Sequence, residues 1–292
     1  MDFDKNIVEK VSRTLVRAGS SFLPDKKAAY EQAIEAETNA LAKWTMETIL
    51  QNAETAEAHS SPLCDDTGIP HVVLEIGTDA AVTGLMLESI QEGVRQGLRR
   101  LPGRPMAVRG DEAQRLDQSL GLDTDPGALE AAPVLVRRTE GNTVRLHILM
   151  FGGGPAIRAK TYRVFHKHSV SAVLDEIVSW AKESAPLLGC TPCTLGVGIG
   201  RSHYEAASMM LLALVDGSYS HQSDMEREIT KRVNLAGTGP LGLGGRHTVL
   251  ATFMKVGPQR ASGVRVVCMR PCCCFEPRIA SVDLGQEGQS DR

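Results

Sequence analysis

The chain of 292 residues is 42% hydrophobic and 23% charged, which supplies enough apolar material for a substantial core and excludes extended disorder. Its 32 Lys and Arg residues against 35 Asp and Glu give a formal net charge of -3, so no broad positive field is present for nucleic acid or an anionic membrane. No stretch approaches the roughly 20 apolar residues of a membrane span, and the opening residues lack the basic and then apolar layout of a secretory signal. We therefore expect a cytoplasmic protein with no nucleic-acid or membrane partner.

Helices are predicted to dominate the first third of the chain. Apolar residues recur at helical spacing over residues 3–58, and the break at Leu23, Pro24 and Asp25 divides them into two helices. The prolines and the glycine of SPLCDDTGIP indicate a loop at 61–70. The elements predicted after this loop are a buried strand at 71–76, an amphipathic helix at 80–101 and an irregular stretch at 102–126.

The rest of the chain is predicted to mix strands and helices. Residues 143–150 alternate apolar and polar side chains, and the turn residues 140–142 join them to residues 133–137 in an antiparallel hairpin. Ser202 followed by Glu205 is typical of a capping box at a helix start. The other predicted elements are helices at 169–183 and 222–235, a loop at 189–200, a glycine-rich turn at 237–245, and strands at 247–256 and 263–267. We predict an α+β fold, mainly helical around a small mixed or antiparallel sheet, with a single domain at 1–284 and a polar tail at 285–292.

Seven cysteines are the clearest chemical signal in the sequence. They are Cys64, Cys190, Cys193, Cys268, Cys272, Cys273 and Cys274. In a reducing compartment such a set favours metal binding or core packing over disulfides. Three separate cysteine-bearing loops, around Cys64, Cys190 and the triplet, are able to meet at one site, because iron–sulfur clusters are held by thiolates from loops. The plainer alternative is that the cysteines are small buried hydrophobic residues.

Carboxylates and glycines near these loops have two interpretations each. Asp65 and Asp66 directly follow Cys64, where a carboxylate beside a metal site is able to exchange a proton with a substrate oxygen. Aspartates also favour turns for purely structural reasons. The glycine-rich pieces at 152–154, 196–200 and 237–245 would allow an anion close to the backbone, but none is a nucleotide-binding loop, so ordinary turn glycines are the default interpretation.

The segments SPLCDDTGIP, FGGG, GCTPCTLGVGIG, NLAGTGPLGLGGRHTVLA and CFEPRIASV occur in this order along the chain. The segments and their order resemble motifs of the class I fumarases and tartrate dehydratases, the iron–sulfur hydro-lyases. SPLCDDTGIP resembles their PxCQDTG loop, FGGG their KGGGSEN loop and GCTPCTLGVGIG their CPPxxLGVGIGGT segment. NLAGTGPLGLGGRHTVLA resembles their NxxGIGPMGLGGKTTAL segment, and CFEPRIASV their CWAxRRAxV end. The resemblance covers about residues 38–282, and the length corresponds to the alpha chain of the two-subunit enzymes. It implies a separate beta subunit, a dimer of heterodimers and a small dicarboxylate substrate.

The resemblance also implies a site. The implied metal ligands are Cys64, Cys190 and Cys274, with Cys272 or Cys273 in place of Cys274 if the loop carries an insertion. They would hold a 4Fe-4S cluster whose fourth iron stays open to act as a Lewis acid in the reversible dehydration of a 2-hydroxy acid. The other implied residues are Asp66 as the catalytic acid or base, and Asp65, Arg104 and Gly154 as substrate-binding residues.

The chain departs from the family pattern at several polar positions, which supports other hypotheses. Phe151 and Pro155 replace a lysine and a serine of the glycine loop, Leu211 and Leu212 occupy lysine positions, and the family's histidine is missing around Arg260. The second hypothesis is therefore a non-catalytic homologue that binds an iron–sulfur cluster or senses through it. A third is a structural zinc protein that uses Cys190, Cys193 and the triplet.

Overall fold

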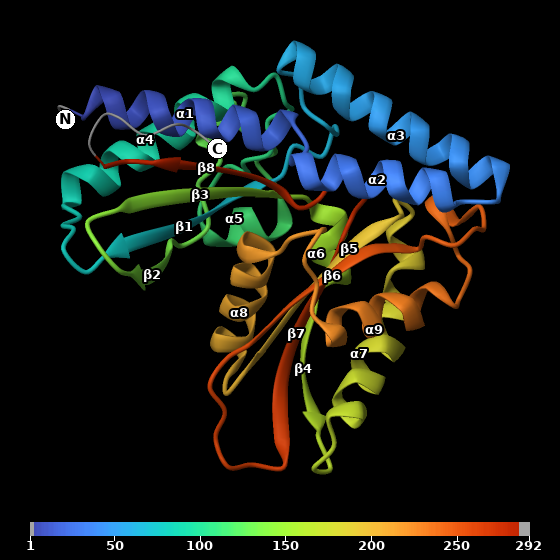
Figure 1. Cartoon of the computed structure of the whole chain (residues 1–292). Coiled ribbons are helices and arrows are strands. Elements are labelled where there is room, and N and C mark those ends of the chain that lie inside the picture. Colours follow the sequence, from blue (N-terminus) through green and yellow to red (C-terminus); the bar gives the residue numbers. More distant parts are fainter. Residues whose placement is uncertain (1–2, 286–292) are drawn as a thin grey trace. The chain divides into compact units, whose positions relative to one another are not determined.

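The computed structural model describes residues 3–285 and divides them into two compact units, each built from segments that are far apart in the sequence (Figure 1). Unit 1 contains residues 3–21, 54–152 and 278–285, and unit 2 contains residues 22–53 and 153–277. The single domain over 1–284 stays a prediction, and the polar tail lies, apart from Gly285, outside the described residues. Across residues 3–285 no helix is long and apolar enough to cross a membrane.

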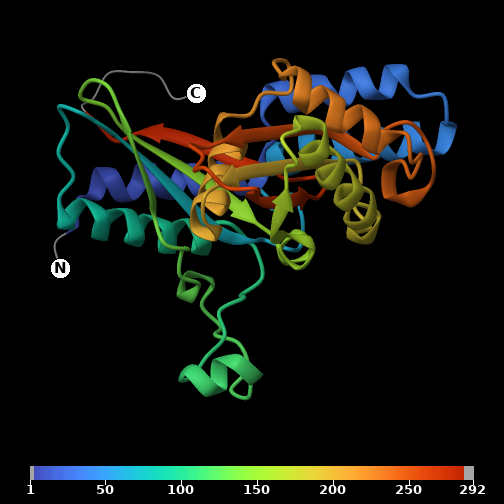
Figure 2. The same cartoon turned by 90° about the horizontal axis from the view of Figure 1, so that it is seen from below.

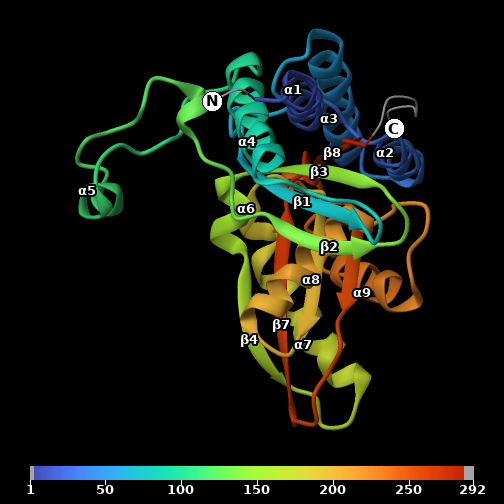
Figure 3. The same ribbon diagram turned by 90° about the vertical axis from the view of Figure 1, so that its left-hand side faces the viewer.

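Unit 1 is a four-stranded sheet covered on one face by two helices (Figure 3). Its main elements are α1 (Lys5–Ser20), β1 (Ile69–Gly77), α4 (Gly84–Arg100), β2 (Leu135–Thr139), β3 (Val144–Phe151) and β8 (Arg278–Asp283). The strand order is β2-β1-β3-β8. Alternate strand residues such as Leu74 and Leu146 point to one face and pack with Val11 of α1 and Val94 of α4. The strand predicted at 71–76 and the helix predicted at 80–101 are thereby confirmed.

The predicted antiparallel hairpin is wrong, because β1 lies between the two strands. β1 is parallel to β2 and antiparallel to β3, so β2 and β3 run in opposite directions without pairing. The end of β1 enters the turn that was expected to close the hairpin, where the Gly77 N–H donates to the Thr143 carbonyl at 2.8 Å. A Cβ atom at Gly77 would lie 2.1 Å from the Gly141 carbonyl oxygen, so this close approach requires glycine.

The stretch predicted to be irregular at 102–126 forms an arm on unit 1. It contains the short helix α5 (Glu112–Asp117), which begins with a capping box between Asp111 and Gln114, and it leads into η1 (Pro126–Ala128). Figure 2 shows α5 well away from the sheet of this unit. The arm therefore buries little of its apolar surface, and Leu116 is 90% exposed.

Unit 2 has a second four-stranded sheet with helices on both faces. Its elements are α2 (Pro24–Ala36), the first part of α3 (Ala40–His59), α6 (Gly153–Arg158), β4 (Lys160–Phe165), α7 (Val170–Ser184), η2 (Pro186–Leu188), β5 (Cys193–Gly200), α8 (His203–Asp216), α9 (Asp224–Asn234), η3 (Pro240–Gly242), β6 (Val249–Val256) and β7 (Val264–Cys272). The order is β4-β7-β5-β6, with β5 parallel to β6 and antiparallel to β7. Two mixed sheets with flanking helices confirm the α+β class.

The loop predicted at 189–200 is wrong over most of its length, because β5 occupies Cys193–Gly200. Its residues alternate, with Val197 and Ile199 in the core formed with α7 and α9, and the glycines on the opposite face. A Cβ atom at Gly198 would lie 2.1 Å from the Ala206 carbonyl oxygen and the Met210 nitrogen of α8. The glycines therefore allow a helix to pack directly on a strand backbone, instead of forming turns.

The remaining boundaries differ from the predictions mainly where helices or strands end. The break at Leu23 is confirmed, but Asn39 adds a second one, because its side chain accepts hydrogen bonds from the backbone of Leu41 and Ala42 and starts α3. The Ser202 side chain caps α8 as predicted, whereas the Glu205 carboxylate bonds Arg201. The helices at α7 and α9 and strand β6 are confirmed, β7 extends to Cys272, and β8 was not predicted.

Candidate functional site

Unit 2 brings together three of the predicted thiols on two loops. Cys190 lies between η2 and β5, and Cys273 and Cys274 directly follow β7. The Cys274 N–H donates to the Cys190 carbonyl at 2.8 Å, which joins the two loops through their backbones. The Cys274 side chain is hydrogen-bonded to both Cys190 and Cys273. The hydrogen bond from Cys274 lowers the pKa of the Cys190 thiol to about 6.

The other unit 2 cysteines are packing residues. Cys193, Cys268 and Cys272 are buried in or beside the sheet, and burial raises the pKa of the Cys193 thiol to about 12. Burial also holds the pKa of Cys272 far above its usual range. The burial of these three agrees with the plainer alternative of small core residues. Within the triplet, the contact with Cys190 favours Cys274 over Cys272 as a ligand.

The zinc hypothesis finds no support among the described residues. Residues 3–285 contain no group of three or more His, Cys, Asp or Glu side chains placed to hold a single metal ion. A structural zinc ion requires four ligands around one centre. Cys193, which the zinc hypothesis requires, is completely buried.

Buried polar side chains hold the backbone next to Cys274, and the sequence analysis did not predict them. On α2, the Tyr30 hydroxyl donates to the Cys274 carbonyl at 2.9 Å, and the Lys26 ammonium donates to the Glu276 carbonyl at 2.9 Å. The Arg270 guanidinium pairs with the Glu276 carboxylate at 3.0 Å, and both side chains are buried. The only sequence signal was the placement of Lys26 and Tyr30 four residues apart, on one face of a helix.

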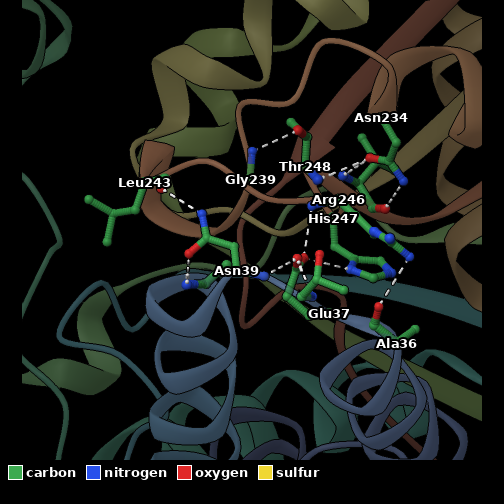
Figure 4. Close-up of polar contacts among 12 residues, drawn as sticks. Ala36, Glu37, Asn39, Asn234, Gly239, Leu243, Arg246, His247 and Thr248 are labelled. Atoms are coloured by element: carbon green, nitrogen blue, oxygen red, sulfur yellow. Dashed lines mark hydrogen bonds and ion pairs between the residues drawn. The ribbon is translucent and has the colours of Figure 1, made fainter.

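Glu37 anchors the far end of the glycine-rich turn at 237–245 (Figure 4). Its carboxylate accepts hydrogen bonds from the backbone N–H groups of Thr38, Asn39 and Arg246 at 2.8–3.0 Å, and lies 3.3 Å from His247 Nδ1. Burial alone raises the pKa of Glu37, but these hydrogen bonds lower it and the net shift is downward. The carboxylate thus stays ionised while holding the turn.

The same turn is fixed beside Cys190. Thr191, the next residue, donates from its hydroxyl to the Gly239 carbonyl at 2.7 Å, and its own carbonyl accepts from the Leu241 N–H at 3.1 Å. The Gly239 N–H donates to the Thr248 hydroxyl at 3.0 Å (Figure 4). The predicted glycine-rich turn is confirmed, and its backbone position is coupled to that of the Cys190 loop.

Unit 1 holds the loop that carries Cys64, Asp65 and Asp66. The buried Arg278 guanidinium donates to the Asp66 carbonyl at 2.7 Å and to the Met150 carbonyl at 3.1 Å, so residues from β8 and β3 fix the loop. The Cys64 sulfur lies 3.8 Å from an Asp65 carboxylate oxygen. Nothing in the sequence indicated that Arg278 would hold this loop.

Arg104 and Asp65, both predicted to bind substrate, form an exposed ion pair in unit 1. Their charged atoms are 3.8 Å apart, at the outer limit of such a pair. The hydroxyl of Thr67, two residues after Asp65, is buried and has no hydrogen-bond partner among the described residues. Among the unit 1 residues, the Arg104 guanidinium is therefore held only by a weak ion pair, and the buried Thr67 hydroxyl is able to form a hydrogen bond.

The structure also places Gly154 and the positions that depart from the family pattern. Gly154 lies exposed in the first turn of α6, where a backbone N–H has no partner within the helix. Phe151 is buried with its ring 4.6 Å from the His71 ring, and Leu211 and Leu212 are buried on α8. The predicted residues fall into two groups, with Cys64, Asp65, Asp66 and Arg104 in unit 1, and Gly154, Cys190 and Cys274 in unit 2.

Comparison with known proteins agrees with the motif resemblance. The sequence profile of the fumarate hydratase (Fumerase) family matches residues 8–282. A Methanocaldococcus jannaschii protein, provisionally assigned as L(+)-tartrate dehydratase subunit alpha, is 28% identical over 278 residues, which cover 91% of this chain and 93% of that protein. The L(+)-tartrate dehydratase subunit alpha of Escherichia coli strain K12 is 21% identical over 247 residues, covering 83% and 79%. Because the profile spans nearly the whole chain, this chain belongs to the fumarate hydratase (Fumerase) family.

Proposed function

We propose that the chain is the alpha subunit of a hydro-lyase that reversibly removes water from a small 2-hydroxy dicarboxylic acid of the malate or tartrate type. The family match and the names of the relatives support a hydro-lyase. The observation that carries the proposal is the pairing of Cys190 with Cys274. It places two thiols side by side, where both are able to bind one cofactor, and it makes the Cys190 thiol easy to ionise. The subunit names of the relatives support a beta-subunit partner, and we propose a dimer of heterodimers.

The proposed cofactor is a 4Fe-4S cluster held by Cys64, Cys190 and Cys274. The thiols of unit 2 fit it, since each cysteine of such a cluster binds a different iron and no three ligands need to surround one ion. Cys64, half-buried on a loop of unit 1, is assigned as the third ligand by the motif resemblance. When bound, the cluster would supply a Lewis-acidic iron to the substrate hydroxyl and carboxylate.

The chain's own residues would bind the substrate and move a proton. A substrate carboxylate is able to replace Asp65 on Arg104, because a bidentate guanidinium contact is stronger than the exposed 3.8 Å pair. The Gly154 N–H would bond a further substrate oxygen. In the dehydration direction Asp66 donates a proton to the departing hydroxyl, which leaves as water when the C–O bond breaks. A base on the beta subunit takes the carbon-bound proton, and the C–H electron pair forms the double bond.

Anaerobic purification followed by iron and sulfide analysis tests the cofactor. We expect about four irons and four sulfides per chain, lost in Cys190→Ser and Cys274→Ser but kept in Cys268→Ala, whose thiol is buried beside Thr161. Absence of iron and sulfide after reconstitution of the wild type contradicts the cofactor assignment.

Activity with a co-purified beta subunit tests the reaction. Asp66→Asn is expected to keep the cluster while dehydration of malate and tartrate is lost, since an amide cannot donate the required proton. Full activity of this variant refutes the role of Asp66. A wild-type complex that holds the cluster without dehydrating any 2-hydroxy acid establishes the non-catalytic alternative.

A further inference from the structure

Lys26 is a completely buried cation in unit 2. Only 1% of its surface is exposed, and its ammonium donates to the neutral Glu276 carbonyl at 2.9 Å. Its Nζ also lies 4.2 Å from the centre of the Phe22 ring. Among residues 3–285 no carboxylate forms an ion pair with it. A buried ammonium without a counter-ion costs several kcal/mol, so its retention requires an explanation.

The nearest carboxylate is already neutralised. Glu276 forms a buried pair with Arg270, whose Nε and Nη2 atoms donate to the carboxylate oxygens at 3.0–3.2 Å. These three ionised groups leave one uncompensated positive charge, on Lys26. Burial lowers the pKa of Lys26 to about 8, with the cysteine triplet and Glu276 opposing the shift, so at pH 7 the group is still mainly protonated.

The thiols of the triplet are the nearby groups that are able to supply the missing negative charge. Lys26 bonds the carbonyl of Glu276, which is only two residues after Cys274, and the three cysteines of the triplet interact electrostatically with its ammonium. One turn further along α2, Tyr30 donates to the Cys274 carbonyl, so the same helix face holds the chain on both sides of Phe275. Neutral thiols leave the positive charge of Lys26 unbalanced, whereas a thiolate balances it.

We propose that Lys26 is a positioning residue that balances, with a fixed buried charge, the negative charge of the Cys274 thiolate when it holds a metal cluster. This inference rests on the proposed function, because it requires thiolates bound to a cluster. A cluster with thiolate ligands gains one more negative charge on one-electron reduction, so a nearby ammonium stabilises the reduced form more than the oxidised form. Removal of the ammonium is then expected to lower the midpoint potential.

The test is a redox titration, followed by electron paramagnetic resonance, of the full chain reconstituted without oxygen. We expect Lys26→Met to make reduction of the cluster at least tenfold less favourable, a negative shift of about 59 mV for a one-electron couple. Lys26→Arg keeps the charge and is expected to retain the wild-type potential. The neighbouring Lys27→Met is the control for loss of a lysine that is not fully buried.

Tyr30→Phe separates charge from loop anchoring. It removes the hydrogen bond to the Cys274 carbonyl without changing any charge, so its potential is expected to stay within the range of the Lys27→Met control. An equal shift in Tyr30→Phe and Lys26→Met, or a wild-type potential in Lys26→Met with full cluster content, overturns the inference. If Lys26→Met does not fold, Lys26→Gln replaces it in the same comparison. Wild-type protein that forms no cluster refutes the proposed cofactor itself, an outcome distinct from an unchanged potential in a loaded variant.

Discussion

Replacement of Gly68 by alanine tests how the loop that carries Cys64 and Asp66 is held. Gly68 has a φ of +92°, which side chains other than glycine rarely adopt. A Cβ atom there would lie 3.0 Å from the backbone N and C of Phe151 and 2.6 Å from an Arg278 guanidinium nitrogen. Phe151 cannot retreat easily, because it is paired with Ile69 in the sheet.

The loss of folding stability in Gly68→Ala has two causes, the strained backbone at a positive φ and the close contacts of the added Cβ atom. Backbone strain costs about 1–3 kcal/mol, and a forced contact of this kind costs about 1–3 kcal/mol more. We expect a loss of about 2–6 kcal/mol in the free energy of unfolding, measured by urea titration. Gly84→Ala is the matched control, since a Cβ atom there meets nothing within 4 Å. Equal stability of the two variants refutes the claim that the loop is fixed against β3 and Arg278.

Three further predictions follow from packing and ionisation. Gly198→Ala pushes α8 off the sheet and is expected to cost about 3 kcal/mol in a urea titration, whereas Gly263→Ala, which meets nothing within 4 Å, costs less than about 1 kcal/mol. Burial lowers the pKa of His147, so the folded state binds fewer protons than the unfolded one just below pH 6.5. Stability is therefore lost as the pH falls through that range, and His147→Gln is expected to reduce this slope. In the metal-free chain, iodoacetamide is expected to alkylate Cys190 with a pH midpoint near 6 while Cys193 stays unreacted at neutral pH; equal reactivity of the two contradicts the pairing with Cys274.

The sequence predicts most helices because their apolar spacing and caps are local properties. Ser169 starts α7, and the predicted range at 169–183 differs from the observed Val170–Ser184 by one residue at each end. Strand pairing is not local, and for this reason the hairpin was wrong. Nothing in residues 133–150 indicates that β1 enters between them, since the decisive contact is the fit of Gly77 against Gly141.

The same limitation explains what was missed in the candidate site. The motif resemblance predicts Cys64, Cys190 and the aspartates as site residues, but the groups that hold their loops come from distant parts of the chain. Arg278 reaches the Asp66 carbonyl across 212 residues, and Lys26 reaches the Glu276 carbonyl across 250. A lysine on a helix is normally expected at the surface. Its burial is a property of the folded unit and cannot be read from α2 alone.

The cysteine triplet shows how the end of a strand gives adjacent cysteines different surroundings, which the sequence does not reveal. Cys272 ends β7 and is buried with its sulfur directed to the Arg270 carbonyl at 3.9 Å, so the strand uses it for packing. Cys274 lies beyond the strand, where its N–H is free to bond the Cys190 carbonyl instead of a neighbouring strand. Adjacent cysteines thus receive different environments because the strand ends between them. A substitution that extends β7 by two residues would therefore pair the Cys274 N–H with a neighbouring strand and separate Cys274 from Cys190, with no change in the number of thiols.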